Sequence, residues 1–214
     1  MGTSWKRNVM PLCVGFLLAA CGQPAFRIYS DRPILSEGEP GPHLRPGLWR
    51  VVNKDCVFDD AKPLGAWPDC ATAVIVRPGE MLTRLTGDAF SRERFVLADG
   101  YPAMLQTISA PEDKEFHFYG VRPVASGGDI VELNRWPALC APGAEEGAAS
   151  GDPSGKEPAN PAPEPERPAL KGFTYDSGQR CPIHTRDQLR AAVIASEGWT
   201  KDREQLRWVR ASET

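Results

Sequence analysis

Seven short apolar or alternating segments, separated by turn-forming residues, constrain what the middle of this chain can fold into. They are residues 48–52, 72–76, 81–85, 95–98, 104–108, 115–121 and 130–133. The connections between them include Pro78-Gly79, Asp99-Gly100 and Gly127-Gly128, which are typical of tight turns and hairpins. Short strands joined this closely favour an antiparallel meander, because parallel strands need long crossovers. We expect a mainly β fold in which a small barrel or a curled sandwich buries the meander.

The clearest alternation runs over residues 115–121. Phe116 and Phe118 are predicted to point to one face of this strand, and His117 and Tyr119 to the other. If the second face lines a barrel, His117 and Tyr119 are candidates for contacting a ligand. The alternative is a half-exposed strand histidine without a functional role.

The C-terminal part changes from a strand pattern to a helix pattern. Thr185 followed three residues later by Gln188 forms a capping box, and an apolar stripe then predicts a helix over residues 186–197. Gly198 is a plausible stop signal for this helix. Residues 206–210 follow it and favour a closing strand over a second helical turn.

Four cysteines remain after the N-terminal region: Cys56, Cys70, Cys140 and Cys181. An even number in an exported chain indicates disulfides, and three pairings are possible. We favour Cys56–Cys70 with Cys140–Cys181, because each pair joins sequence neighbours. Free thiols and a zinc site that uses Cys181 with His184 are the alternatives. The zinc alternative lacks a second pair of ligands at a comparable spacing, so we predict no metal site.

The N-terminus has the pattern of an export signal. Lys6 and Arg7 precede an apolar run over residues 9–20, which ends in Leu18-Ala19-Ala20-Cys21-Gly22. This run has the length of a signal-peptide core and is too short for a membrane-spanning helix. The segment resembles a bacterial lipoprotein signal with its lipobox. An ordinary cleaved signal and a buried core helix are the alternatives.

The lipoprotein resemblance implies an address and a modification. Residues 1–20 would be removed, and Cys21 would become the acylated first residue that holds the chain on a membrane. In Gram-negative lipoproteins an aspartate after the cysteine favours retention in the inner membrane. Gly22 stands at that position, so the resemblance implies the periplasmic face of the outer membrane.

Composition divides the chain into a leader, two loose segments and two ordered parts. Residues 21–45 contain four prolines and are predicted to form a flexible tether. Residues 141–171 hold seven Pro, four Gly and seven Ala with one large apolar residue, Leu170, which predicts a disordered excursion. The β domain is expected over residues 46–140, with residues 172–214 packed on it.

Charge and motifs exclude several classes of function. Of 25 basic residues, two leave with the leader, so 23 face 28 acidic ones, which argues against nucleic-acid binding. Nucleophile elbows, phosphate-binding loops and zinc-protease motifs are absent from the sequence, and no cofactor is implied.

Acidic pairs for acid–base chemistry occur at Asp59-Asp60 and Glu112-Asp113. We expect a non-enzymatic envelope lipoprotein that binds a partner or small ligand or has a structural role. The alternative is a periplasmic hydrolase without a recognisable motif.

Overall fold

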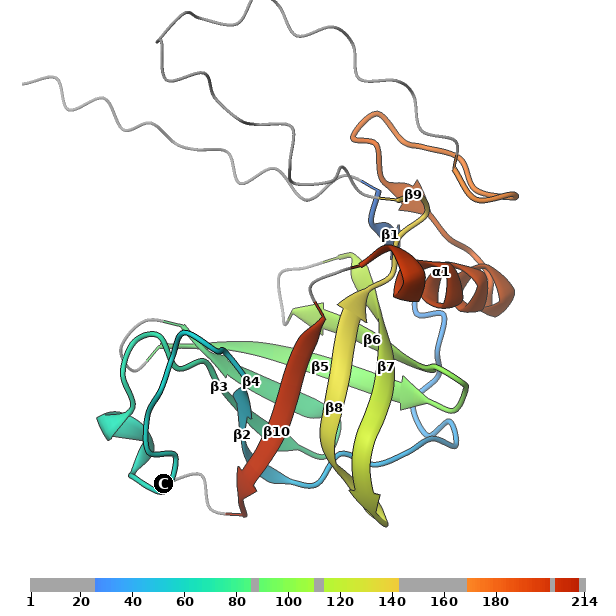
Figure 1. Cartoon of the computed structure of the whole chain (residues 1–214). Helices are drawn as coiled ribbons and strands as arrows, with labels where there is room; N and C mark the ends of the chain where they lie inside the picture. Colours follow the sequence, from blue (N-terminus) through green and yellow to red (C-terminus); the bar gives the residue numbers. More distant parts are fainter. Residues whose placement is uncertain (1–25, 86–88, 110–113, 143–168, 201–202, 212–214) are drawn as a thin grey trace, which may run out of the picture.

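The chain folds around a closed antiparallel β-barrel with one α-helix packed against its side (Figure 1). This computed structural model describes residues 26–85, 89–109, 114–142, 169–200 and 203–211. The leader, Cys21, and residues 143–168 of the predicted excursion lie outside the described residues. So do Glu112 and Asp113.

Eight strands form the barrel, and each is hydrogen-bonded to two neighbours. They are β2 (Gly47–Val51), β3 (Ala73–Arg77), β4 (Glu80–Arg84), β5 (Phe90–Ala98), β6 (Ala103–Ser109), β7 (Phe116–Gly127), β8 (Asp129–Pro137) and β10 (Glu204–Arg210). From β2 to β8 each strand pairs with the next one along the chain, and β10 closes the ring between β8 and β2. The expected mainly β meander is confirmed, in its barrel form, and the segment at 206–210 is the closing strand.

The barrel interior is filled by the inward-facing residues of all eight strands. Its buried members are Trp49, Val74, Val76, Met81, Leu97, Ala103, Leu105, Val121, Ile130, Leu133 and Leu206. A barrel of eight strands is just wide enough for side chains to fill it or for one small ligand to enter. Here the middle of the barrel is an apolar core.

The α-helix α1 (Arg186–Trp199) begins at the predicted cap, where the Thr185 side chain accepts a hydrogen bond from the Gln188 N–H. Its buried stripe is Leu189, Ala192, Val193 and Ser196. This stripe packs against the outer wall of the barrel around Trp136, whose indole N–H donates to the Val193 carbonyl at 3.2 Å. The predicted stop at Gly198 is wrong, because the helix continues to Trp199.

Two disulfides join Cys56 to Cys70 and Cys140 to Cys181, which confirms the favoured pairing. Each lies with a tryptophan in a buried cluster: Trp67 with Cys56, and Trp136 with both cysteines of the second bridge. The first bridge ties down the loop that holds a short 3-10 helix, η1 (Leu64–Ala66).

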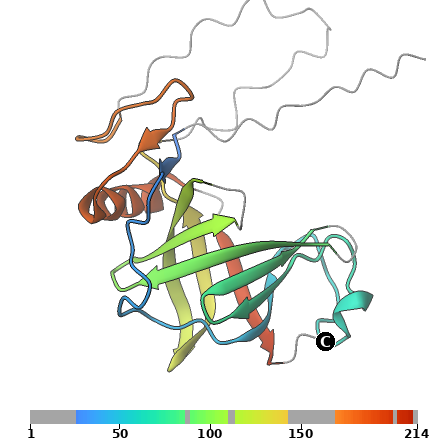
Figure 2. The ribbon, with the colours of Figure 1, turned by 180° about the vertical axis from the view of Figure 1, so that it is seen from behind.

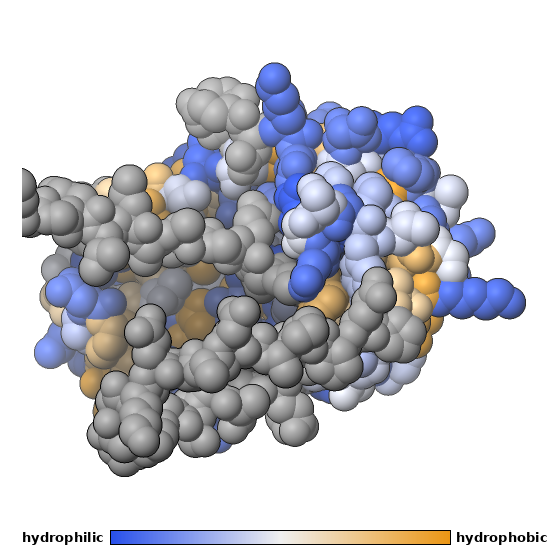
Figure 3. Space-filling model, turned by 90° about the horizontal axis from the view of Figure 1, so that it is seen from above, coloured by the Kyte–Doolittle hydropathy of each residue, from blue (hydrophilic) through white to orange (hydrophobic). Residues whose placement is uncertain are grey.

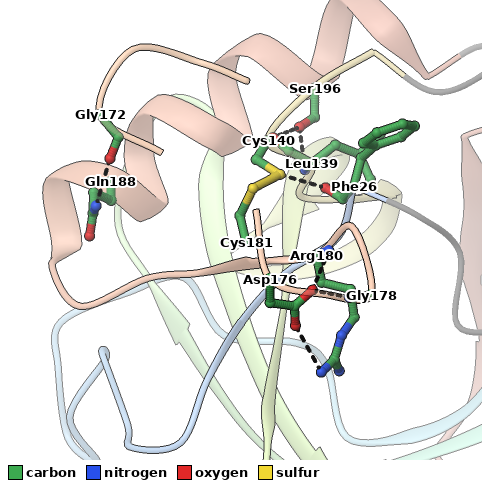
Figure 4. Close-up of a disulfide and its surroundings, with 10 residues drawn as sticks. All are labelled: Phe26, Leu139, Cys140, Gly172, Asp176, Gly178, Arg180, Cys181, Gln188 and Ser196. Carbon is green, nitrogen blue, oxygen red and sulfur yellow. Dashed lines mark hydrogen bonds and ion pairs between the residues drawn. A yellow bond between two sulfur atoms is a disulfide. The ribbon is translucent and has the colours of Figure 1, made fainter. Parts of the chain in front are cut away.

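The second disulfide closes a small structure at one end of the barrel, which we call the cap. It consists of residues 26–30, 138–142 and 169–183, and includes β1 (Ile28–Ser30) and β9 (Cys181–Pro182). β1 pairs with the start of β7 on one edge and with β9 on the other. Ser196 of α1 connects the helix to the cap, since its hydroxyl accepts a hydrogen bond from the Leu139 N–H at 2.6 Å (Figure 4).

Residues 26–45 are not the flexible tether that their prolines predicted. Ile28 and Leu35 are each only 1% exposed and belong to the cluster around Trp136. Proline restricts the backbone without preventing a segment from packing, and here the apolar residues between the prolines are buried. The segment from residue 26 to residue 45 is therefore part of the folded domain.

Candidate functional site

His117 and Tyr119 both lie on the inward face of β7, as the alternation predicted. Tyr119 packs against the interior core, and its neighbour on the same face, Val121, is a buried member of that core. In the sheet register His117 lies opposite Thr107 of β6 and Tyr29 of β1. Both candidate side chains are half-buried, and they belong to the end of the barrel that carries the cap.

The same end of the barrel contains an arginine–glutamate pair that was not expected from the sequence. Arg135 of β8 donates two hydrogen bonds to Glu204 of β10, which is its register partner. The Arg135 guanidinium also lies 5.0 Å from the centre of the Tyr119 ring. These contacts hold Arg135 in a cation–π and ion-pair arrangement within the barrel wall.

Burial is the largest single influence on the pKa of Arg135 and would lower it, but Glu204, Tyr119 and Glu93 together outweigh burial and raise the pKa above its ordinary value. A permanently charged guanidinium that is already paired with a carboxylate supplies orientation and specificity more readily than proton transfer.

Asp59 and Asp60, the two acidic candidates within the described residues, lie in the loop between Cys56 and Cys70 and not beside His117. Asp59 accepts a hydrogen bond from the Ala61 N–H in the loop between Cys56 and Cys70. Asp60 ion-pairs with Arg50 at 3.2 Å. Asp60 thus ties the disulfide loop to β2, whereas Asp59 stabilises a turn within the loop.

A second site lies outside the predictions, along the segment that enters the barrel. We call residues 31–46 the strap: they run from the cap along the wall formed by β5 and β6, and then cross the far end of the barrel to β2 (Figure 2). Gln106 of β6 holds the strap at its first half. Its side-chain oxygen accepts hydrogen bonds from the Ile34 and Leu35 N–H groups at 2.8 and 2.9 Å, and its amide nitrogen donates to the Leu35 carbonyl at 3.1 Å.

Two further contacts fix the second half of the strap. A Cβ at Gly41 would lie 2.1 Å from the carbonyl oxygen of Leu97, so the strap approaches β5 more closely than any side chain would allow. Farther on, Ile130 donates a hydrogen bond to the His43 carbonyl at 2.7 Å and accepts one from the Arg45 N–H at 3.0 Å. The strap is thus a fixed part of the structure.

Between the strap and the barrel lies a groove of about 1050 Å³, which we call the strap groove. Its apolar lining includes Leu35, Phe95, Val96, Leu97, Ile108 and Phe116. Ligand pockets for small molecules have this order of volume and a predominantly apolar lining. The strap groove therefore has the size and the surface of a small-molecule site.

Acidic and basic residues also line the strap groove. They are Glu37, Glu39, Arg77, Arg94 and Asp129. Glu39 ion-pairs with Arg186 at 2.6 Å, Glu37 lies 3.9 Å from Arg94, and Arg77 lies 3.7 Å from Glu80. Three acidic and two basic side chains therefore line the groove, and four of these five have an oppositely charged partner in the groove or next to it.

The sequence carries a signal for Gln106, which follows three apolar residues in the mainly apolar strand β6. It carries none of this kind for Arg135, because the strand β8 also contains Glu132 and Asn134. Polar residues require a specific partner when buried. The partner, however, comes from a distant part of the chain in both cases.

The chain matches no family model, no curated protein and no solved structure. None of the helices in the described ranges is both long and apolar enough to cross a bilayer. Within those ranges, no three histidine, cysteine, aspartate or glutamate side chains come together in a metal-binding arrangement.

Proposed function

We propose that the protein is an exported lipoprotein, anchored through Cys21, whose barrel binds a small and uncharged apolar molecule in the strap groove. The observation that carries the binding function is the groove itself, with its volume of about 1050 Å³ and its apolar lining. The two disulfides support the proposal that the protein is exported, because such bonds form and persist in oxidising compartments. The lipobox at Leu18-Ala19-Ala20-Cys21 supports the anchor.

The lining of the groove favours an uncharged ligand over a charged one. Four of its five acidic and basic side chains have an ion-pair partner within 4 Å: Glu37 with Arg94, Glu39 with Arg186, and Arg77 with Glu80. A charged ligand would have to compete with these partners. An uncharged apolar molecule gains from burial against Phe95, Ile108 and Phe116 without that cost. With Gly22 after the cysteine, we place this binding function at the periplasmic face of the outer membrane.

We do not propose the hydrolase alternative. In the register of the sheet His117 faces Tyr29 and Thr107, and Asp60 ion-pairs with Arg50. General acid–base chemistry needs titrating groups within hydrogen-bonding reach of a substrate and of one another.

Binding to the strap groove is tested with Nile red, an uncharged dye that fluoresces in apolar surroundings. We expect saturable binding to the full chain and a loss of affinity in Ile108→Glu of at least about tenfold, since a carboxylate in an apolar site costs more than about 1.4 kcal/mol. Ile108 is half-buried and lines the groove. Dye titration of the folded variants, checked by near-UV circular dichroism, is the measurement.

Val124→Glu is the matched control. Val124 is an apolar residue of β7 that is 53% exposed and lies away from the groove lining. This variant should bind the dye as the original chain does. Equal losses in the two variants, or no saturable binding in the original chain, would contradict the proposed site.

A further inference from the structure

The position of Phe26 sets where a membrane anchor must hold this domain. Phe26 is tied to the cap by two backbone hydrogen bonds, from its own N–H to the Gln179 carbonyl and from the Cys140 N–H to its carbonyl, both 2.8 Å long. Its ring also lies 5.8 Å from that of Tyr175. The chain therefore leaves the folded domain at the cap, as Figure 1 shows for β1 and β9.

The anchor has little room between Cys21 and this exit point. Only four residues lie between Cys21 and Phe26, so five Cα–Cα steps place their Cα atoms at most about 18 Å apart. A tether reaching to residue 46 would have allowed about 90 Å. Because residues 26–45 pack on the barrel, an acylated Cys21 would hold the cap next to the lipid headgroups.

We propose that the cap is a membrane-facing surface, and that the barrel stands on the bilayer with its β7–β8 turn directed away from it. This inference rests on the proposed anchor at Cys21. The two ends of the molecule are well separated, because β7 starts beside β1 of the cap and runs twelve residues to the far turn. At about 3.3 Å per residue this is about 36 Å.

The composition of the cap fits an anionic lipid surface. It contains three basic residues, Arg27, Lys171 and Arg180, and one acidic residue, Asp176, whereas the mature chain as a whole is acidic. Arg180 ion-pairs with Asp176 at 3.2 Å and with Glu115, just before β7, at 2.7 Å, so Arg27 and Lys171 are the basic residues that the cap offers to a lipid surface. Basic residues close to an anionic leaflet are attracted to it.

The acidic group of the cap is also firmly held. Burial would raise the pKa of Asp176, but hydrogen bonds from the backbone N–H groups of Arg180 and Gly178 lower it below its usual value (Figure 4). Phe26 and Tyr175 add two half-buried rings, and tyrosine is enriched at membrane–water interfaces. Viewed from the side of the cap, the coloured surface mixes hydrophilic residues with separate apolar patches (Figure 3), which suits contact with headgroups rather than insertion.

The orientation has a consequence for the strap groove. The groove is lined in part by the β3–β4 turn at Arg77–Gly79 and by Asp129 next to the β7–β8 turn, which belong to the end opposite the cap. In the proposed orientation a ligand therefore enters from the aqueous side, and the bilayer does not cover the groove.

Lipid photo-cross-linking tests the orientation. The acylated full chain, carrying benzoylphenylalanine in place of either Thr174 or Asp129, is reconstituted in vesicles of phosphatidylethanolamine and phosphatidylglycerol. Thr174 is exposed in the cap and Asp129 is exposed at the far turn. We expect lipid adducts from position 174 at least about tenfold above those from position 129, because β7 extends for about 36 Å between the cap and the far turn. Equal or reversed labelling in the membrane-bound protein would overturn the orientation while leaving the anchor in place.

A longer connection between Cys21 and Phe26 tests whether the short connection is what holds the cap at the membrane. Inserting twenty Gly/Ser residues between Gln23 and Pro24 lengthens the connection fivefold and should lower labelling from position 174 about tenfold, since local concentration falls with the three-halves power of tether length. The same insertion after Ser154 is the control and should leave labelling unchanged. Undiminished labelling with the longer tether would overturn the proposal. Failure of the original chain to bind vesicles would instead overturn the proposed anchor together with the orientation.

Discussion

Gly120→Ala is expected to destabilise the protein by about 3 kcal/mol, at the upper end of the range for overpacked cores. A Cβ at Gly120 would lie 2.3 Å from Cε2 of Trp136. Trp136 is 1% exposed and its indole donates to the Val193 carbonyl of α1, so the ring cannot move aside without disturbing the helix. The strand and the helix would have to separate to admit one methyl group.

Thermal unfolding followed by circular dichroism measures this effect. We expect the midpoint to fall by about 6–12 °C, given about 2–4 °C per kcal/mol for a chain of this size. Gly65→Ala is the matched control, because a Cβ there meets no atom within 4 Å. Its midpoint should change by less than about 2 °C, as expected from about 0.5 kcal/mol for surface changes. A tolerated alanine at position 120 would show that α1 is not locked against this wall.

Removal of the cap disulfide is expected to have a still larger effect. Cys140 and Cys181 are 41 residues apart, and loop entropy predicts a loss of about 4 kcal/mol in Cys140→Ala/Cys181→Ala. Both cysteines are 0% exposed and belong to the cluster that joins the cap, α1 and the barrel. We therefore expect the cap and α1 to lose protection from hydrogen exchange before the barrel does.

The other disulfide provides the comparison. Cys56–Cys70 spans 14 residues, so Cys56→Ala/Cys70→Ala should lose about 3 kcal/mol and leave exchange in the cap unchanged. Chemical denaturation and hydrogen exchange of the two double variants give both quantities. If the cap stays protected without Cys140–Cys181, packing alone maintains it and the expected role of the bridge is wrong.

Local patterns were sufficient to predict the elements of the barrel. Each of the seven expected segments is a strand, and the capping pair Thr185 and Gln188 marks the true start of the helix. The disulfides could be paired because each joins neighbouring cysteines. The ends of β5 and β7 were less predictable. Arg92, Arg94 and Arg122 interrupt the apolar pattern, but the strands continue through them because these residues are paired in the sheet.

The strap and its groove could not be predicted, because they depend on contacts between distant residues. Pro33, Pro40 and Pro42 gave the strap the composition of a tether. Its attachment depends on Gln106, which is more than seventy residues away in sequence, and on the close approach of Gly41 to Leu97. Neither contact leaves a periodic pattern in the sequence.

The inward position of Tyr119 followed from alternation, but its surroundings did not. The Arg135–Glu204 pair beside it requires β10 to lie against β8, and that pairing exists only once the barrel is closed. Long-range pairing of this kind is set by the whole fold and not by a local segment. The proposed lipid anchor is the opposite case, since it was inferred from the local pattern of residues 6–22 alone.

The N-terminal mass of the protein extracted from membranes tests the central claim most directly. We predict a mature chain that begins at Cys21 and carries a diacylglyceryl group on its sulfur, and that moves entirely to the soluble fraction in Cys21→Ser. A chain that retains Lys6 and Arg7, has an unmodified Cys21 and is found in the soluble fraction would contradict the anchor. The same result would also contradict the proposed membrane-facing cap and the compartment proposed for the strap groove.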